Sequence, residues 1–230
     1  MSLLAYNIHA NENNTNALTE IKSESNHDTI AKDANDTNEL WWKKWDAAIK
    51  DPNDPNEILQ VKWNSIMNVL QTKQLDQDLQ KKIIDKVVTP IFDSELMAKL
   101  VLGRTNWPKL NAQQQKDFTE LFTKRLKNFY LDKISQYKDE KAIFKSPIQN
   151  KNNLSVPMVL ISNGKEITIL YKLHKLNEKE ISKTKIYWKI YDVEIEDISI
   201  LLTYQSQFDD ILRQGGVKDL FEQLEKSPAK

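Results

Sequence analysis

The spacing of hydrophobic residues changes twice along this 230-residue chain, and that change restricts the fold more than any other feature. In the first half, apolar residues recur every three to four positions, as on one face of a helix. Between residues 142 and 195 they alternate with polar residues, which is the period of a half-buried strand. Helical spacing returns after residue 198. This order predicts an α+β fold with a four-stranded antiparallel sheet and a bundle of helices on one side.

Several helix ends have recognisable signals. Asp54-Pro55 provides a cap followed by proline in the first turn, and Asp93 is expected to cap a helix that ends at Gly103. Asn111 is expected to start the longest helix, and Gly215-Gly216 to separate the last two. The expected helical stripes span residues 40–49, 59–70, 79–88, 96–101, 118–137, 198–212 and 217–224.

The strand region contains a strong hairpin signal. Asn163-Gly164 lies between two alternating runs and fits a type I′ turn. The residues 177–184 are polar and are expected to form a hairpin loop. The predicted strands span residues 142–147, 154–162, 166–175 and 185–195.

The chain is expected to hold one folded domain, over residues 37–226. Residues 1–36 are rich in asparagine and poor in apolar side chains, so we expect a disordered or tether-like leader. Residues 227–230 form a short tail. The first ten residues show no secretory signal, because they lack a basic start and a long apolar stretch.

Composition excludes several kinds of function. The 33 basic and 33 acidic residues give no net charge, which argues against nucleic-acid binding. There is no cysteine for disulfides, thiolate catalysis or thiolate metal ligands. No apolar run approaches the ~18 residues that a membrane span needs. We therefore expect no nucleic-acid partner and no integral membrane segment.

Few polar residues are candidates for catalysis. His174, one of three histidines, shares a strand face with Lys172 and is expected to be solvated at the surface. Asp93 fits a helix cap, and Asp192 is expected to anchor a backbone group or a basic partner. The acidic side chains at this strand end make only a weak cation site: Glu194, Glu196 and Asp197. The sequence thus predicts no enzyme, no metal and no cofactor.

Two segments carry a specific resemblance. The first is FDSELMAKLVLGRTNW at residues 92–107, which is similar to the pattern F-D-x-x-x-M-A-R-x-V-L-G-R-x-W. The second is WKIYDVEIEDISILLTYQSQFDDILRQGG at residues 188–216, which is similar to W-K-V-Y-D-V-x-V-E-G-V-S-L-V-x-N-Y-R-S-Q-F. Both resemble the MlaC, or toluene-tolerance, family of phospholipid-binding proteins. The departures are Lys99 for arginine, Asp197 for glycine, Gln205 for arginine, and an extra residue at Asn106.

The resemblance implies a strongly curved sheet with a lipid pocket between the sheet and the helices. Hiding some thirty methylenes, at about 0.8 kcal/mol each, is worth on the order of 24 kcal/mol, so the pocket must be deep. The residues expected to contact lipid are apolar or aromatic positions of the two motifs and of the long helix. They are Phe92, Met97, Leu100, Val101, Phe122, Phe129, Tyr130, Trp188, Tyr191, Val193, Ile198, Leu201, Leu202 and Tyr204.

The implied function is that of a periplasmic carrier with a bound phospholipid as cargo. It would take lipid between an inner-membrane ABC transport complex and an outer-membrane lipoprotein complex, maintain outer-membrane lipid asymmetry, and approach membranes only transiently. Two alternatives remain open. One is a small-molecule enzyme on a cone-like α+β fold, using a desolvated carboxylate such as Asp93 or Asp192. The other is an envelope adaptor that holds no ligand.

Overall fold

The computed structural model describes residues 45–73, 75–150, 153–184 and 187–226. The predicted leader at 1–36, the tail at 227–230 and the first half of the predicted helical stripe at 40–49 lie outside these residues, so the predicted domain limits stay predictions. The chain divides into two units after Ala48, and the fold below is that of the unit from Ile49 onward. Within the described residues, no helix has the length and apolar character needed to cross a membrane.

The helices begin where the sequence places capping residues. The side chain of Asp54 accepts a hydrogen bond from the Asn56 amide, and Asp93 accepts one from the Leu96 amide. Asn111 forms a reciprocal capping box with Gln114. The helices of this unit are α3 (Pro55–Gln71), α4 (Gln77–Val88), α5 (Ser94–Asn106), α6 (Ala112–Ile134), α7 (Glu178–Thr184) and α8 (Ile200–Glu225), with short 3-10 turns η1 (Thr89–Ile91) and η2 (Trp107–Lys109).

The last predicted helix pair is one element interrupted by a kink. Gly216 has φ of +73° inside α8, a value that L side chains rarely adopt. This confirms the expected break at Gly215-Gly216. The glycine pair therefore redirects the chain so that Leu220 and Leu224 can be buried.

The described residues form a six-stranded antiparallel sheet rather than the predicted four-stranded one. Its order is β1-β3-β4-β5-β6, and β2 pairs with β3 beside β1. The strands are β1 (Lys141–Phe144), β2 (Ile148–Asn150), β3 (Asn153–Ser162), β4 (Lys165–Lys175), β5 (Trp188–Ile195) and β6 (Ile198–Ser199). The unpredicted strands β2 and β6 are three and two residues long, too short to display a period.

The predicted hairpin turn between β3 and β4 is confirmed. Asn163 and Gly164 have φ of +50° and +73°, as a type I′ turn requires. The turn pairs Ser162 with Lys165 and sets the register of the two longest strands. In that register Met158 lies opposite Ile169, so inward-facing residues of both strands share one face.

The predicted polar loop at residues 177–184 is wrong, because this segment contains the short helix α7. The side chain of Asn177 accepts from the Glu180 amide, and Glu180 accepts from the Asn177 amide. This reciprocal capping stabilises the first turn of a segment whose polar composition otherwise suggests a loop.

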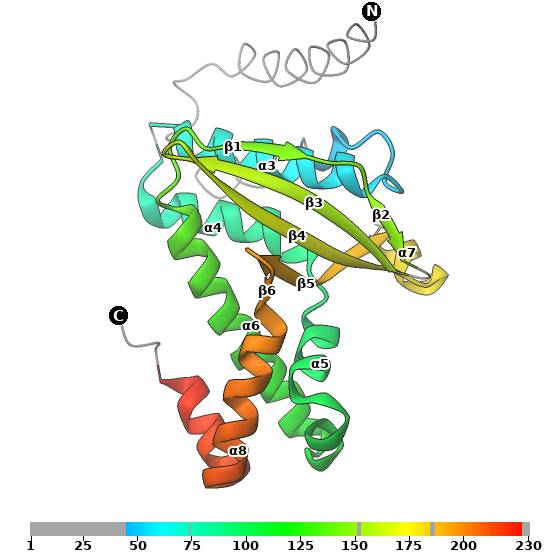
Figure 1. The fold of residues 1–230 in the computed structure, drawn as a ribbon, viewed down its shortest axis with the longest axis vertical. Coiled ribbons are helices and arrows are strands. Elements are labelled where there is room, and N and C mark those ends of the chain that lie inside the picture. Colours follow the sequence, from blue (N-terminus) through cyan, green and yellow to red (C-terminus); the bar gives the residue numbers. More distant parts are fainter. Residues whose placement is uncertain (1–44, 74, 151–152, 185–186, 227–230) are drawn as a thin grey trace, which may run out of the picture. The chain divides into compact units, whose positions relative to one another are not determined.

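Buried apolar side chains of the described residues form two clusters. One lies between the sheet and α3 and includes Leu59, Met158 and Ile190. The other lies among α5, α6 and α8 and includes Phe118 and Phe122. Figure 1 shows α3 and α4 behind the sheet and α5, α6 and α8 extending below it. Phe92 packs against both clusters and therefore marks their junction.

Candidate functional site

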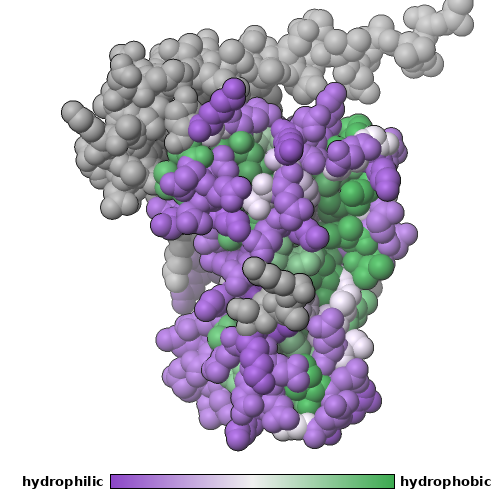
Figure 2. Space-filling view, turned by 90° about the vertical axis from the view of Figure 1, so that its left-hand side faces the viewer, coloured by the Kyte–Doolittle hydropathy of each residue, from purple (hydrophilic) through white to green (hydrophobic). Residues whose placement is uncertain are grey.

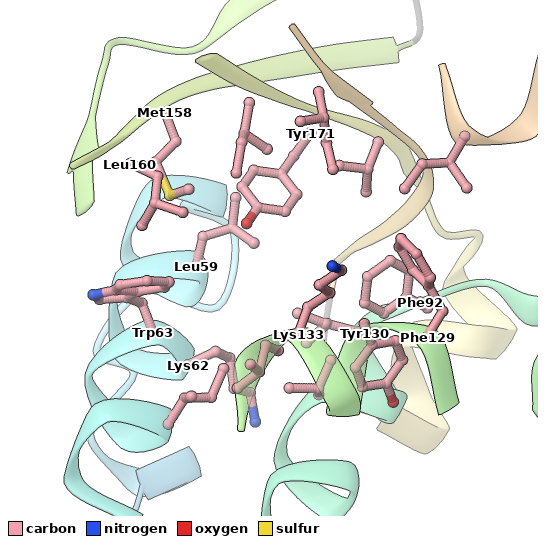
Figure 3. A pocket seen from close by; sticks show the side chains of 18 of the residues that line it. Leu59, Lys62, Trp63, Phe92, Phe129, Tyr130, Lys133, Met158, Leu160 and Tyr171 are labelled. Carbon is pink, nitrogen blue, oxygen red and sulfur yellow. The ribbon is translucent and has the colours of Figure 1, made fainter. Parts of the chain in front are cut away.

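An apolar cavity of about 520 Å³ lies beneath the sheet, beside this junction. Its volume falls within the ~300–1,000 Å³ of small-molecule sites. Figure 3 shows its labelled side chains: Met158 and Leu160 come from β3, Tyr171 from β4, and Leu59 and Trp63 from α3. Phe129, Tyr130 and Lys133 come from α6, and Phe92 from the segment before α5.

The sheet wall of the cavity follows from strand alternation. Met158 and Leu160 are buried on one face of β3, and Ile169 is buried on the same face of β4. Val193 adds β5 to this wall, and Phe144 adds β1. Figure 2 shows hydrophobic surface gathered along one side of an otherwise hydrophilic face. The cavity wall is thus mainly hydrocarbon, which suits apolar parts of a ligand.

The helical wall is fixed by a polar network behind it. Asp85 Oδ1 accepts hydrogen bonds from the Tyr130 hydroxyl at 3.1 Å and from Thr89 at 2.5 Å. Lys127 pairs with the same carboxylate at 3.2 Å. The Tyr130 ring stacks on Phe92 at a centroid distance of 6.2 Å. Burial raises the pKa of Tyr130 above its ordinary value, with Asp85 adding to the effect, so the phenol stays protonated as a donor.

Asp93 joins the start of α5 to the sheet beside the cavity. Its amide donates to the carbonyl of Ile190 at 2.8 Å, and its Oδ2 lies 2.8 Å from His174 Nε2. Burial alone would raise the pKa of the Asp93 carboxyl, but hydrogen bonds from His174 and the Leu96 amide hold the pKa below its ordinary value. His174 is partly buried against Asp93 instead of solvated, contrary to the prediction.

Asp192 has the anchoring role that the sequence predicts. It is 4% exposed and accepts hydrogen bonds from the amides of Val193 and Leu201 and from the Ser199 hydroxyl. Lys172 Nζ lies 3.3 Å from its second oxygen and also pairs with Glu194. The carboxylate therefore fixes the reversal from β5 through β6 into α8.

The predicted lipid contacts are distributed over several places. Those that line the cavity are Phe92, Met97, Phe129, Tyr130 and Val193. Those that belong to the cluster among α5, α6 and α8 are Val101, Phe122, Leu201 and Tyr204. Leu100, Ile198 and Leu202 are exposed at the surface. The remaining two lie on β5: Trp188 belongs to the cluster between the sheet and α3, where its indole donates to the Asn53 carbonyl, and the Tyr191 ring lies against His174.

The predicted contacts in the cluster among α5, α6 and α8 touch other side chains and not the cavity, because these three packed helices fill the space around them. Phe122, for example, stacks on Phe118 and meets Phe208 edge to face. Several wall residues were missed, among them Leu59, Trp63, Lys133, Met158, Leu160 and Tyr171. The inward alternation of 158–160 and 167–171 was visible in the sequence, but it identifies a buried face and not an unfilled one.

The carboxylates considered for catalysis lie outside the cavity lining. Asp93 and Asp192 are held by His174 and Ser199. Glu140 lines the cavity within the described part of the chain, and its side chain accepts from the Ser162 hydroxyl and the Lys138 amide. In the same part of the chain, no group of three His, Asp or Glu side chains is placed to hold a metal ion.

A curved antiparallel sheet closed by helices over an apolar cavity defines a class of α+β proteins built to enclose a ligand. The chain belongs to the MlaC family: the profile described as MlaC protein matches residues 60–226, which confirms the resemblance of the two motifs.

The fold is also that of a solved relative, a phospholipid-binding protein from Ralstonia solanacearum determined in complex with a phospholipid. The TM-score is 0.64 at 18% sequence identity, over 75% of this chain and 95% of that one. At this identity the likeness is one of fold. No curated protein matches the sequence.

Proposed function

We propose that this protein is a phospholipid carrier that holds the acyl chains of its cargo in the cavity beneath the sheet. The observation that carries the proposal is a cavity of about 520 Å³ with a mainly apolar wall, in a chain of the MlaC family. The phospholipid complex of the Ralstonia solanacearum relative, which has the same fold, supports this choice of ligand.

The energetics favour a carrier with such a cavity. Each buried methylene contributes about 0.8 kcal/mol, so a lipid leaves a bilayer readily only for a site that also excludes water. Side chains such as Leu160 and Val193 offer hydrocarbon contact. Hydrogen bonds attach Tyr130 to Asp85 and Asp93 to the sheet, and so fix the position of the helices that border the cavity. The protein contributes a site and no energy source, so direction must come from its partners.

The cellular role that we infer is transport across the periplasm. The carrier would exchange lipid with an inner-membrane ABC transport complex and an outer-membrane lipoprotein complex, and so maintain outer-membrane lipid asymmetry. Membership of the MlaC family supports these partners. A net charge of zero suits transient contact, because a basic surface would retain the protein on anionic membranes.

Native mass spectrometry of the gently purified protein, followed by lipid extraction, tests the proposal. We expect one phospholipid per chain, and transfer of labelled phospholipid between two vesicle populations at a rate that rises with protein concentration. Protein that contains no phospholipid and accelerates no transfer would contradict the carrier function. It would favour the adaptor without a ligand.

A further inference from the structure

Several polar groups of the cavity lining have no protein partner among the described residues, and two of them lie on facing walls, β4 and α6. Within the described residues, the Tyr171 hydroxyl makes no hydrogen bond and the Lys133 ammonium forms no ion pair. Figure 3 shows the Lys133 side chain rising from α6 into the space beneath Tyr171, and the Tyr171 oxygen directed toward Leu59 on α3. The mainly apolar lining therefore carries a hydroxyl on β4 and a cation on α6 that face the same space.

The Tyr171 hydroxyl requires an explanation. Burial raises its pKa above the ordinary value, with Tyr137 adding to the effect, so the group is a neutral phenol and a donor. Among the described buried side-chain atoms, only Asn56 Oδ1 is enclosed without a partner, so the Tyr171 hydroxyl is open to the cavity and not sealed in protein. Most polar groups away from bulk water are hydrogen-bonded in folded proteins. The hydroxyl is thus placed to donate to something that enters the cavity.

Lys133 differs from the other lysines of the described lining, Lys62 and Lys127. Lys127 is paired with Asp85, and Figure 3 shows the nitrogen of Lys62 directed away from Tyr171. Lys133 lies in the last turn of α6 and is exposed to water. The nearby carboxylate of Glu140 is engaged by Ser162 and the Lys138 amide. An incoming anion would therefore meet a cation that no described side chain neutralises.

We propose that Lys133 and Tyr171 together anchor the polar part of the ligand. Lys133 pairs with a phosphate where the cavity meets solvent, and Tyr171 donates to an ester carbonyl deeper inside. Such an anchor selects an ester of glycerol phosphate, which has both an anion and an ester carbonyl. A free fatty acid has an anion but no separate ester, and a diacylglycerol has esters but no anion. The inference rests on the proposed function and specifies the ligand of that cavity.

The test compares phosphatidylglycerol with a diacylglycerol and a fatty acid of the same chain length, each displacing a fluorescent lipid from the protein. We expect the wild type to bind phosphatidylglycerol about tenfold more tightly than diacylglycerol, as a charge-assisted contact predicts. Lys133→Gln removes this preference and leaves diacylglycerol binding unchanged. Lys124→Gln, an exposed lysine of the same helix outside the cavity, keeps it.

A second variant tests the Tyr171 hydroxyl separately. Tyr171→Phe keeps the ring and removes only the donor, so both ester lipids weaken by a similar factor of several-fold while the fatty acid does not change. An unchanged preference in a folded Lys133→Gln protein would overturn the inference although phospholipid still binds. A wild type that binds none of the three lipids would instead overturn the proposed function. Thermal unfolding of each variant verifies that it is folded.

Discussion

At the scale of single residues, Asp93 shows what a sequence reveals and what it hides. Its capping role was predicted, because the hydrogen bond to the Leu96 amide depends only on neighbours along the chain. Its contact with His174 spans 81 positions and depends on the register of β4 against β5. Alternation correctly assigned His174 to a face of the strand, but no local pattern indicates which distant side chain meets that face.

Asp93 is expected to stabilise the fold in a pH-dependent way. Its pKa in the folded protein is below the ordinary value of 3.8, so its contribution is present above that pH and is lost as the pH falls through the lowered pKa. Asp93→Asn keeps a capping side chain and should lower the free energy of unfolding at pH 7 by about 1 kcal/mol. Asp93→Ala also loses the cap and should lower it by about 2 kcal/mol.

Urea denaturation at pH 7 and at pH 3 measures both effects. The difference between the wild type and Asp93→Asn should shrink at pH 3, where the wild-type carboxyl approaches protonation. A difference that is the same at both pH values would show that the charge of Asp93 contributes nothing.

Asp197 occupies a backbone conformation that favours glycine. Its φ is +64°, directly after Glu196 at +50°, in the turn between β5 and β6. The MlaC-family pattern that the second motif resembles has glycine at this position, and the turn gives the physical reason for it. Asp197→Gly is expected to raise the free energy of unfolding by about 0.5 kcal/mol. Asp197→Ala lacks the freedom of glycine at positive φ and should not raise the free energy of unfolding. If urea denaturation shows that both substitutions stabilise the protein equally, backbone strain at Asp197 is not the reason.

At the scale of elements, long periodic segments were predicted well and short ones were not. The starts of α3, α5 and α6 match their capping signals, and the β3–β4 hairpin matches its turn. The sequence did not predict β2 and β6, because these short segments are strands through pairing with β3 and β5 and not through their local composition. Helix α7 depends on one reciprocal cap in an otherwise polar segment.

The β4 strand offers a matched pair of substitutions for the cavity. Ile167 lines the cavity, whereas Thr168 is exposed on the opposite face. Ile167→Trp should fill space that acyl chains would use and remove most of the copurified phospholipid. Thr168→Trp adds the same ring outside and should retain it. Native mass spectrometry gives the occupancy; equal occupancy in the two folded variants would place the acyl chains elsewhere.

At the scale of the whole folded unit, the described apolar residues serve two purposes that sequence cannot separate. One cluster is closed by aromatic contacts such as Phe118 on Phe122. The other is interrupted by the cavity, so that residues such as Met158 border unfilled space. Both give the same helical or alternating pattern. Whether an apolar face meets a side chain or a ligand depends on the separation of the elements, which hydropathy does not encode.

Phe122 and Phe129 separate these two purposes experimentally, since both lie on α6 and both were predicted to contact lipid. Phe122 is fully buried, so Phe122→Ala should lower the free energy of unfolding by about 3–5 kcal/mol. If Phe122 contacts only protein, its loss should leave the lipid preference of the folded fraction unchanged. Phe129 lines the cavity and is 46% exposed, so Phe129→Ala should cost less than about 1 kcal/mol of stability.

The loss of hydrocarbon contact in Phe129→Ala should weaken phospholipid binding by about fivefold to tenfold. Urea denaturation together with lipid displacement therefore gives opposite results for the two variants: one loses stability and keeps affinity, the other loses affinity and keeps stability. If Phe129→Ala binds phospholipid as the wild type does and Phe122→Ala does not, the ligand lies among α5, α6 and α8, and the cavity beneath the sheet is not its site.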